Sequence, residues 1–373
     1  MESVDFMKIF LLVTKSETVL TFRKGLIEKL KQSGYQIGVI AYDADRKEEI
    51  VALGVSFYCV EQDNRGLNPF AILQHQKKIK QILKEEAPDI AFTFQLKPNT
   101  FGVQAAKAAG VKNIFCMVEG AGDVFNNQSL KWKLVRTVVC QLYRGAFCHA
   151  QKVFFLNTDD KAEFEERKLV SPRQSELVHG IGVNLEHFAF KPIKNSRTFL
   201  MVARMLKAKG VLEYCKCARL VKQKYPDAVF NYLGAEGTVT LEDIREYLDD
   251  GSVCHLGTTK DVRSHLEDCA CLLLPSSYRE GLPMSIMEAE ATGRVIITCN
   301  NVGCRDTVID GYNGYLVPCG DYEALAQKCI YLIEYPEVLT QMGANSRAFA
   351  EEQFDQKVIS ETLLTVLEQN CEK

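Results

Sequence analysis

The segment Leu274–Glu288 combines glycine, proline and two glutamates in a spacing that could hold a phosphorylated ligand. An apolar run passes into a polar loop, and Pro283 then marks the first turn of a helix. Backbone amides at the amino terminus of a helix bind anions, and Gly281 lets a ligand approach the backbone closely. Glu280 and Glu288 supply carboxylate acceptors for hydroxyl groups. The segment therefore predicts a site for a diphosphate that joins a sugar to a ribose.

A second pattern of the same kind places Arg204 and Lys209 just after the apolar run Leu200–Ala203. Arginine offers phosphate oxygens a planar fork, and lysine offers a point charge. Taken alone, two cations after a strand are more often surface residues, and a glutamate pair more often caps a turn or faces solvent. Together the two segments favour ligand binding. We call this sugar-bearing diphosphate ligand the donor. The residues expected to bind it are Arg204, Lys209, Glu280, Gly281, Leu282, Pro283 and Glu288.

Polar residues also follow apolar runs in the first half of the chain. Glu119 stands between such a run and a glycine-rich turn, where it could accept a proton from an acceptor hydroxyl or orient a sugar. Lys97, with Asn99 and Thr100 close behind, could meet a phosphate of the donor or of a lipid carrier. Two alternatives stay open, because Glu119 could bond to nearby backbone amides and Lys97 could be a surface lysine before a proline.

The stretch Asn126–Asn157 contains several cations, no acidic side chain and the only tryptophan of the chain. Its basic and apolar residues are arranged as on an amphipathic helix, which an anionic membrane surface would attract. The expected membrane-contact residues are Lys131, Trp132, Lys133 and Arg136. The alternative is an ordinary helix that packs its apolar face on a sheet.

The elements that position these residues can be predicted from the pattern of apolar residues. Short apolar runs alternate with amphipathic stretches along the whole chain, which predicts repeated β-α units and parallel sheets. We expect strands at Lys8–Val13, Gln36–Ala41, Val55–Val60, Asp89–Phe94, Asn113–Val118, Lys152–Leu156, Thr198–Ala203, Ala228–Leu233, Cys271–Leu274, Val295–Thr298 and Gly314–Val317. Helices are expected at Val19–Gln32, Asn68–Glu86, Thr100–Ala109, Leu130–Phe147, Gly210–Tyr225, Asp261–Asp268, Pro283–Thr292 and Tyr322–Glu334.

The alternation restarts after a segment rich in glycine and proline, so two domains are expected. We place an acceptor-side Rossmann-like domain at 1–190, a nucleotide-sugar-binding Rossmann-like domain at 191–345 and a helical tail at 346–373, which could pack on either domain. Two facing domains of this α/β class predict a ligand cleft between them, at the carboxyl ends of the strands.

Composition narrows the function classes. The 373 residues carry a net charge of −3, which argues against a broad nucleic-acid surface. The short, acidic beginning of the chain does not resemble a secretory signal, and no apolar run is long enough to span a membrane. The fourteen cysteines are expected to be reduced thiols. These features together lead us to expect a cytoplasmic protein. Asp43-Ala-Asp45 is a lone match to a metal-binding spacing, and we expect neither a required metal nor a cofactor.

Three motifs occur in an order that resembles the signature of the retaining glycosyltransferase family 4. They are Ala203-Arg-x4-Lys-Gly210, Glu280-Gly-Leu-Pro-x4-Glu288 and Asp310-Gly-Tyr-Asn-Gly-Tyr-Leu-Val317. The resemblance implies the GT-B fold, two facing Rossmann-like domains with a cleft between them. It also implies that Arg204 and Lys209 bind the donor diphosphate, that Glu280 contacts the sugar and that Glu288 holds the ribose.

A narrower resemblance involves Leu67-Asn-Pro-Phe70, Lys97-Pro-Asn-Thr-Phe-Gly102, Ala105-Ala-Lys107 and Val118-Glu-Gly-Ala-Gly122. These motifs are similar to those of enzymes that extend undecaprenyl-diphosphate-linked sugars, such as N-acetylgalactosaminyltransferases of bacterial glycan assembly. The resemblance implies a UDP-sugar donor, a polyprenyl-diphosphate-linked acceptor and a place at the inner face of the cell membrane, in capsule, other surface polysaccharide or glycoprotein glycan synthesis. Many family members have a histidine where Glu119 stands.

The expected reaction is the transfer of a sugar such as N-acetylgalactosamine, with retained configuration and without a carboxylate nucleophile. The expected catalytic residues are Glu280, Glu119, Arg204 and Lys209. Two alternatives stay open: a UDP-sugar 2-epimerase on the same fold, and a non-catalytic subunit that binds nucleotide sugars.

Overall fold

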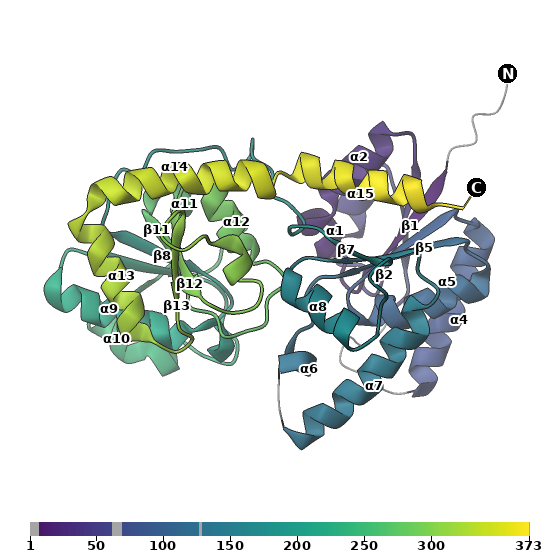
Figure 1. Ribbon diagram of the computed structural model, residues 1–373, viewed down its shortest axis with the longest axis horizontal. Helices are drawn as coiled ribbons and strands as arrows, with labels where there is room; N and C mark the ends of the chain where they lie inside the picture. Colours follow the sequence, from purple (N-terminus) through teal and green to yellow (C-terminus); the bar gives the residue numbers. More distant parts are fainter. Residues whose placement is uncertain (1–6, 62–68, 127–128, 373) are drawn as a thin grey trace. The chain divides into compact units, whose positions relative to one another are not determined.

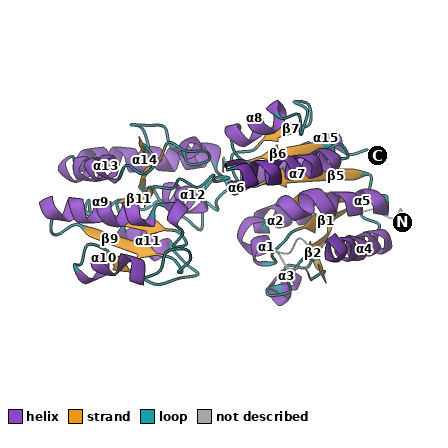
Figure 2. Ribbon diagram, turned by 90° about the horizontal axis from the view of Figure 1, so that it is seen from below, coloured by secondary structure: helices purple, strands orange, loops and turns teal. Residues whose placement is uncertain are grey.

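The computed structural model of the protein describes residues 7–61, 69–126 and 129–372. The chain divides into two compact units, unit 1 with Met1–Gly182 and Gln356–Lys373, and unit 2 with Val183–Asp355 (Figure 1). These limits differ from the expected 1–190, 191–345 and 346–373, because the first boundary follows Gly182 and the expected tail divides between the two units. Each unit contains one parallel sheet with helices around it (Figure 2).

The sheet of unit 1 has seven parallel strands in the order β3-β2-β1-β4-β5-β6-β7. Neighbouring residues of β1 point into different cores, since Ile9 belongs to one hydrophobic cluster and Phe10 to another. Both faces of the sheet are therefore buried, as continuous apolar strands require. The strands are β1 (Lys8–Leu12), β2 (Gln36–Ala41), β3 (Ser56–Cys59), β4 (Ile90–Phe94), β5 (Asn113–Val118), β6 (Lys152–Phe155) and β7 (Ser175–Leu177).

Helices cover both faces of this sheet. One face carries α1 (Glu17–Phe22), α2 (Lys24–Gln32), α3 (Lys47–Ala52) and α15 (Gln356–Asn370). The other carries α4 (Pro69–Glu86), α5 (Val103–Ala109), α7 (Leu130–Phe147) and α8 (Thr158–Glu166). A π-helical turn, η1 (Pro98–Gly102), leads into α5, and the short α6 (Asp123–Asn126) precedes α7.

Unit 2 contains six parallel strands in the order β10-β9-β8-β11-β12-β13. They are β8 (Thr198–Val202), β9 (Val229–Leu233), β10 (Cys254–His255), β11 (Cys271–Leu274), β12 (Val295–Cys299) and β13 (Gly314–Val317). The α-helices are α9 (Val211–Lys224), α10 (Arg245–Asp249), α11 (Arg263–Asp268), α12 (Met284–Ala291), α13 (Tyr322–Glu334) and α14 (Pro336–Gln353). The 3₁₀ turns are η2 (Lys207–Lys209), η3 (Glu242–Ile244) and η4 (Arg305–Thr307).

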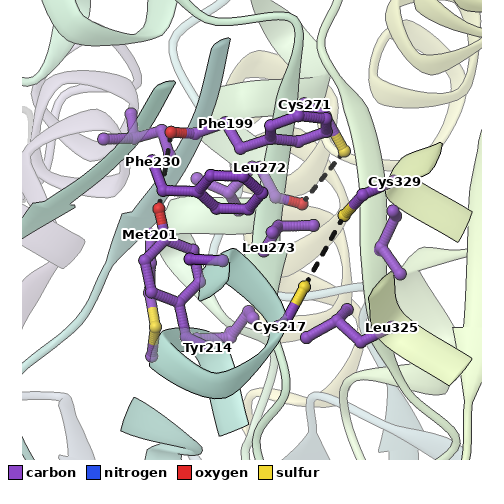
Figure 3. Packing of buried hydrophobic residues seen from close by; sticks show 14 of the residues in the cluster. Phe199, Met201, Tyr214, Cys217, Phe230, Cys271, Leu272, Leu273, Leu325 and Cys329 are labelled. Atoms are coloured by element: carbon purple, nitrogen blue, oxygen red, sulfur yellow. Dashed lines mark hydrogen bonds between the residues drawn. The ribbon is translucent and has the colours of Figure 1, made fainter. Parts of the chain in front are cut away.

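The core of unit 2 joins the sheet to α9 and α13 (Figure 3). The rings of Phe199 and Phe230, on adjacent strands, stack with centroids 4.7 Å apart. The buried Tyr214 hydroxyl donates to the carbonyl oxygen of Asn231 at 2.7 Å, so its polar end is satisfied. The thiols of Cys217 and Cys329 lie 3.9 Å apart between α9 and α13. This packing holds rigid the strands whose ends carry the candidate site.

The expected strands and helices are present, with two informative differences. The expected helix Val19–Gln32 is two helices, α1 and α2, because the backbone leaves the helical region at Arg23 (φ −120°). The short edge strands β7 and β10 were not predicted, since two or three residues carry too little periodicity to detect. The expected cap Asn68 and the motif residue Leu67 lie outside the described residues.

The end of the chain serves both units. Helix α14 packs on α12 within unit 2, whereas α15 packs on α2 within unit 1 (Figure 1). Leu363 and Leu367 of α15 are buried in the same cluster as Leu26 of α2. The sequence left the partner of this tail open, and the structure divides it at Gln356.

Candidate active site

Lys209 and Glu280 meet at the carboxyl ends of β8 and β11 in unit 2, where the strand order reverses. Such a switch point is where doubly wound folds bind ligands. The Lys209 ammonium pairs with Oε1 of Glu280, and the Ser276 hydroxyl donates to the same oxygen at 3.0 Å. Both charged side chains are largely buried, which strengthens their attraction. Thus the structure brings two of the expected residues into direct contact.

The two loops that carry this pair are joined by backbone hydrogen bonds. The carbonyl oxygen of Ala208 accepts from the amides of Ser277 and Tyr278, at 2.8 and 3.0 Å. Gly210 follows with φ +80°, and a Cβ atom there would overlap the carbonyl oxygen of Pro275. Glycine is therefore required for this close approach. The motif glycine next to Lys209 fixes the loop that presents the cation.

A third loop, after β12, closes around the backbone of the motif. The Asn301 amide donates to the carbonyl oxygen of Tyr278 at 2.7 Å. Gly303 has φ +76°, and a Cβ atom there would lie 2.5 Å from the carbonyl oxygens of Glu280 and Gly281. Sequence analysis did not select Asn301 or Gly303, because neither stands in a motif and their partners lie more than 20 residues away.

Helix α12 begins directly after this loop. Pro283 is its N-cap, no side chain caps it, and Leu282 is buried beside it. The amide groups of the first turn of a helix have no partner within the helix, so they can bind an anion. The first residue of the helix, Met284, stands four residues after Glu280 and four residues before Glu288. This arrangement can bind a diphosphate.

Glu288 is half-buried in α12. Burial raises its pKa to about 8, and the negative charge of Asp261 contributes in the same direction. The Asp261 carboxylate accepts from the Arg263 guanidinium, with Nε at 2.8 Å and Nη2 at 2.6 Å among the donors, so that carboxylate stays charged. A carboxyl group that is poised between its two forms near neutral pH is typical of functional sites.

Arg204 extends from the loop after β8 and is exposed. Within the described residues its guanidinium has no hydrogen-bond or ion-pair partner. All five of its N–H donors are thus available to phosphate oxygens. Arg204 therefore differs from Lys209, which Glu280 holds in place.

In unit 1, Glu119 follows β5 and is held from two sides. One carboxylate oxygen pairs with the guanidinium of Arg23, and the other accepts from Nε2 of Gln95 at 2.9 Å. Neither Arg23 nor Gln95 was among the residues expected at the site. Arg23 lies inside an amphipathic run and meets its partner 96 residues away, so no local signal marks it.

Lys97, Asn99 and Thr100 were expected together on the acceptor or phosphate side, but Asn99 and Thr100 turn their side chains into the fold. The Asn99 side chain is fully buried, donates to the carbonyl oxygen of Met117 at 2.7 Å and accepts from the hydroxyl of Thr93. The Thr100 hydroxyl donates to the carbonyl oxygen of Leu96 at 2.8 Å. Both side chains form hydrogen bonds within the fold, because η1 turns them inward, and their place on the acceptor or phosphate side stays a prediction. Lys97 itself is buried.

The residues expected at a membrane surface differ in how exposed they are in the structure. Lys131 and Lys133 are exposed on α7, and Trp132 is half-buried. Arg136 is buried and donates from Nε to the carbonyl oxygen of Val124 at 2.8 Å, and its contact with a membrane stays a prediction. In the described part of the chain, no helix is both long and apolar enough to cross a membrane.

Asp43 of the Asp-x-Asp motif has a structural role. Its carboxylate accepts from the backbone amide and the hydroxyl of Ser16. Across residues 7–61, 69–126 and 129–372, no three His, Cys, Asp or Glu side chains are grouped as a metal site would require.

Two sequence profiles match the chain. The profile described as "Glycosyl transferase 4-like" matches residues 8–157, and the one described as "Glycosyl transferases group 1" matches residues 183–349. The chain is a group 1 glycosyltransferase of family 4. The resemblance identified from the motifs is therefore confirmed.

This glycosyltransferase is similar to enzymes that act on lipid-linked sugars. It is 28% identical to the N,N'-diacetylbacillosaminyl-diphospho-undecaprenol alpha-1,3-N-acetylgalactosaminyltransferase of Campylobacter jejuni, over 96% of this chain and 97% of the relative. It is 25% identical to the UDP-Gal:alpha-D-GlcNAc-diphosphoundecaprenol alpha-1,3-galactosyltransferase of Escherichia coli, over 86% and 85%. The capsular polysaccharide biosynthesis glycosyltransferase CapM of Staphylococcus aureus is 23% identical, over 95% of each chain.

Solved structures confirm the fold of the glycosyltransferase. A glycosyltransferase from Rickettsia africae superposes with a TM-score of 0.80 at 19% identity, over 99% of this chain and 100% of the other. HepE of Anabaena, in complex with UDP, superposes with a TM-score of 0.79 at 17% identity, over 97% and 100%. At these identities the likeness concerns the fold alone, and the expected GT-B class is confirmed.

Proposed function

We propose that this glycosyltransferase serves bacterial glycan assembly by moving a sugar from a UDP-sugar to a saccharide linked to polyprenyl diphosphate. The sugar is an N-acetylhexosamine such as N-acetylgalactosamine, and its configuration is retained. The observation that carries the proposal is the Lys209–Glu280 pair beside the amino terminus of α12. The acceptor class is supported by the Campylobacter jejuni and Escherichia coli relatives, whose names both contain an undecaprenyl diphosphate.

The diphosphate of the donor is bound by positive groups of unit 2. An ammonium group has three donors, so Lys209 can hold Glu280 and still bind a phosphate oxygen. Arg204 adds an exposed guanidinium, and α12 adds the amides of its first turn. These groups stabilise the charge that develops on the departing UDP, which is the main need of the reaction. Because they neutralise the leaving group, neither a metal ion nor another cofactor is required.

The sugar and the ribose are bound by the two motif glutamates. Glu280 is oriented by Lys209 and Ser276, and its carboxylate can accept from sugar hydroxyls. The backbone from Gly281 to Pro283 lies against the diphosphate, and Glu288 in α12 accepts from ribose hydroxyls. Glu280, Lys209 and Arg204 thus form the catalytic set of unit 2.

The acceptor is bound by unit 1. Glu119 lies at the end of β5 and orients the acceptor hydroxyl or accepts its proton. Lys97, after β4, contributes a cation for a phosphate of the donor or the carrier lipid.

Helix α7 supports the proposal that unit 1 lies on an anionic membrane at the inner face of the cell. Its exposed surface carries Leu130, Leu134 and Val138, which are 85%, 69% and 55% exposed and lie on one face at i, i+4 and i+8. Lys131 and Lys133 flank this apolar row. An apolar row with flanking cations matches a peripheral helix in the lipid headgroup region.

The test is donor turnover by the purified protein. UDP-GalNAc, UDP-GlcNAc, UDP-Gal and UDP-Glc are each incubated with membrane-extracted polyprenyl-diphosphate sugars, for the wild type, Glu280→Ala and the control Glu242→Ala. Glu242 is an exposed glutamate of the same unit, paired with Arg245. We expect UDP release that depends on the acceptor, is lost in Glu280→Ala and is kept in Glu242→Ala. Epimerised donor without acceptor, or tight UDP binding without transfer, would contradict the proposal.

A further inference from the structure

Arg23 is among the largest fully buried side chains of the protein, and it lies at the interruption between α1 and α2. Its Nη1 donates to the carbonyl oxygen of Thr18 at 2.9 Å, and its Nη2 pairs with Glu119. The guanidinium carbon lies 4.2 Å from the centre of the Phe94 ring. Both terminal nitrogens of the guanidinium are therefore held, whereas its buried Nε has no hydrogen-bond partner among the described residues. The two held nitrogens fix the direction of its pair with Glu119.

Hydrogen bonds connect Glu119 to residues that follow two other strands of unit 1, β4 and β1. Gln95, after β4, donates to the second carboxylate oxygen of Glu119 and accepts from the amide and the hydroxyl of Thr14, at 3.0 and 2.8 Å. Thr14 follows β1. The strand order reverses between β1 and β4, so this chain of hydrogen bonds crosses the switch point of unit 1. Gln95 has φ +68°, a strained conformation for a residue other than glycine.

Most of the side chains that line the cavity beside the Arg23–Glu119 pair are apolar, with Ser360 as an exception. A small cavity beside the pair is walled by Leu26, Phe94 and Met117. Burial lowers the pKa of Arg23, and Glu119 opposes that change. A buried ion pair is rarely the most stable filling for such a site, since apolar side chains often stabilise the fold as well or better. Stability alone therefore does not explain an arginine at this position.

We propose that Arg23 is a positioning residue for sugar transfer, acting through Glu119. The guanidinium fixes the position of the Glu119 carboxylate at the end of β5. Gln95 binds the second carboxylate oxygen and so fixes the rotation of the carboxylate about its bond to the side chain. The remaining lone pairs of Glu119 then accept from the hydroxyl of the acceptor in one defined direction. This inference rests on the proposed function, in which Glu119 acts on the acceptor side.

The test is a double-mutant cycle with Arg23→Gln, Glu119→Gln and the variant that combines both. For each we would measure kcat of transfer, the KM for acceptor and the affinity for UDP by calorimetry. If Arg23 acts through Glu119, each single variant lowers kcat by about 100-fold, as a misplaced group does. The combined variant loses no more than the stronger single one. UDP affinity stays within about twofold of the wild type, because the proposed donor residues belong to unit 2.

Two further variants separate positioning from stability. Arg23→Lys should recover part of kcat, since an ammonium can still pair with Glu119. Arg294→Lys is the matched control, because Arg294 is equally buried but donates only to backbone carbonyl oxygens, including that of Cys269 at 2.7 Å. It should lower the midpoint of thermal unfolding and leave kcat of the folded protein unchanged.

The inference fails if Arg23→Gln transfers sugar like the wild type, or if the losses of the two single variants multiply in the combined one. In both cases the wild type would still turn over, so the proposed function would stand. Absence of transfer by the wild type would instead overturn both.

Discussion

Lys209 and Glu280 form an ion pair across 71 residues of sequence, and Ser276 donates to the same carboxylate oxygen. The pair joins the loop after β8 to the loop after β11. The pair orients both the ammonium and the carboxylate, so each group can bind a different part of a UDP-sugar.

Lys209→Met is expected to lower kcat by about 100-fold and to weaken UDP binding, because a cation that stabilises the departing diphosphate is removed. Steady-state kinetics and calorimetry measure the two effects. Lys207→Met is the matched control, since Lys207 is exposed in the same 3₁₀ turn. Equal losses in the two variants would mean that overall positive charge, and not the position of Lys209, matters.

Gly210→Ala is expected to destabilise unit 2 and to displace the loop that carries Lys209. Alanine at positive φ costs about 1 kcal/mol or more, and its Cβ would also overlap the Pro275 carbonyl oxygen. Gly251→Ala is the control, because Gly251 also has a positive φ but has open space around it. Denaturant unfolding should show the larger loss for Gly210→Ala. A loss no larger than that of Gly251→Ala would contradict the close-approach explanation.

Donor affinity is expected to rise with pH through about 8, the pKa of Glu288. Below that pH the carboxyl group is mostly protonated, and ribose hydroxyls donate better to the carboxylate, so binding of UDP should release a proton. Calorimetry in buffers of different ionisation enthalpy measures that proton. Glu288→Gln should abolish its release, and persistence of the release in this variant would assign the proton to another group.

The same raised pKa sets the pH dependence of stability. The protonated form of Glu288 is favoured in the folded state, so its contribution is present below the ordinary value of 4.5 and is lost as pH rises towards 8. The unfolding temperature of Glu288→Gln minus that of the wild type should therefore be larger near pH 8 than near pH 5. Thermal melts at the two pH values test the sign, and an equal difference at both would contradict it.

Replacing Leu134 and Val138 together by serine is expected to reduce binding of the protein to vesicles that contain an anionic phospholipid, several-fold in co-sedimentation. Both side chains are exposed on α7, so the fold should not change. Val358→Ser is the control, because Val358 is also 55% exposed but lies on α15. Unchanged sedimentation of the double variant would exclude this face of α7 as the membrane contact.

The order of strands and helices could be predicted from sequence, because each element leaves a local pattern of apolar residues. The placement of Arg204, Lys209 and Glu280 after strands follows from the same patterns, and it predicted the switch-point site of unit 2. Glycine at position 210 also has a local signal, although its reason, the close Pro275 carbonyl, is a tertiary contact.

Other features depend on contacts between distant segments. Strand order makes β8 and β11 neighbours, and only then can Lys209 reach Glu280. Burial of Arg136 and Asn99 depends on which face of a helix meets the sheet, so the local sequence patterns did not predict it. The Arg23 ion pair has no sequence signal for the same reason. The sequence by itself determined the elements and the motif residues at their ends, because those depend on neighbours along the chain. Tertiary structure alone decided which charges pair, because pairing depends on distances between segments far apart in sequence.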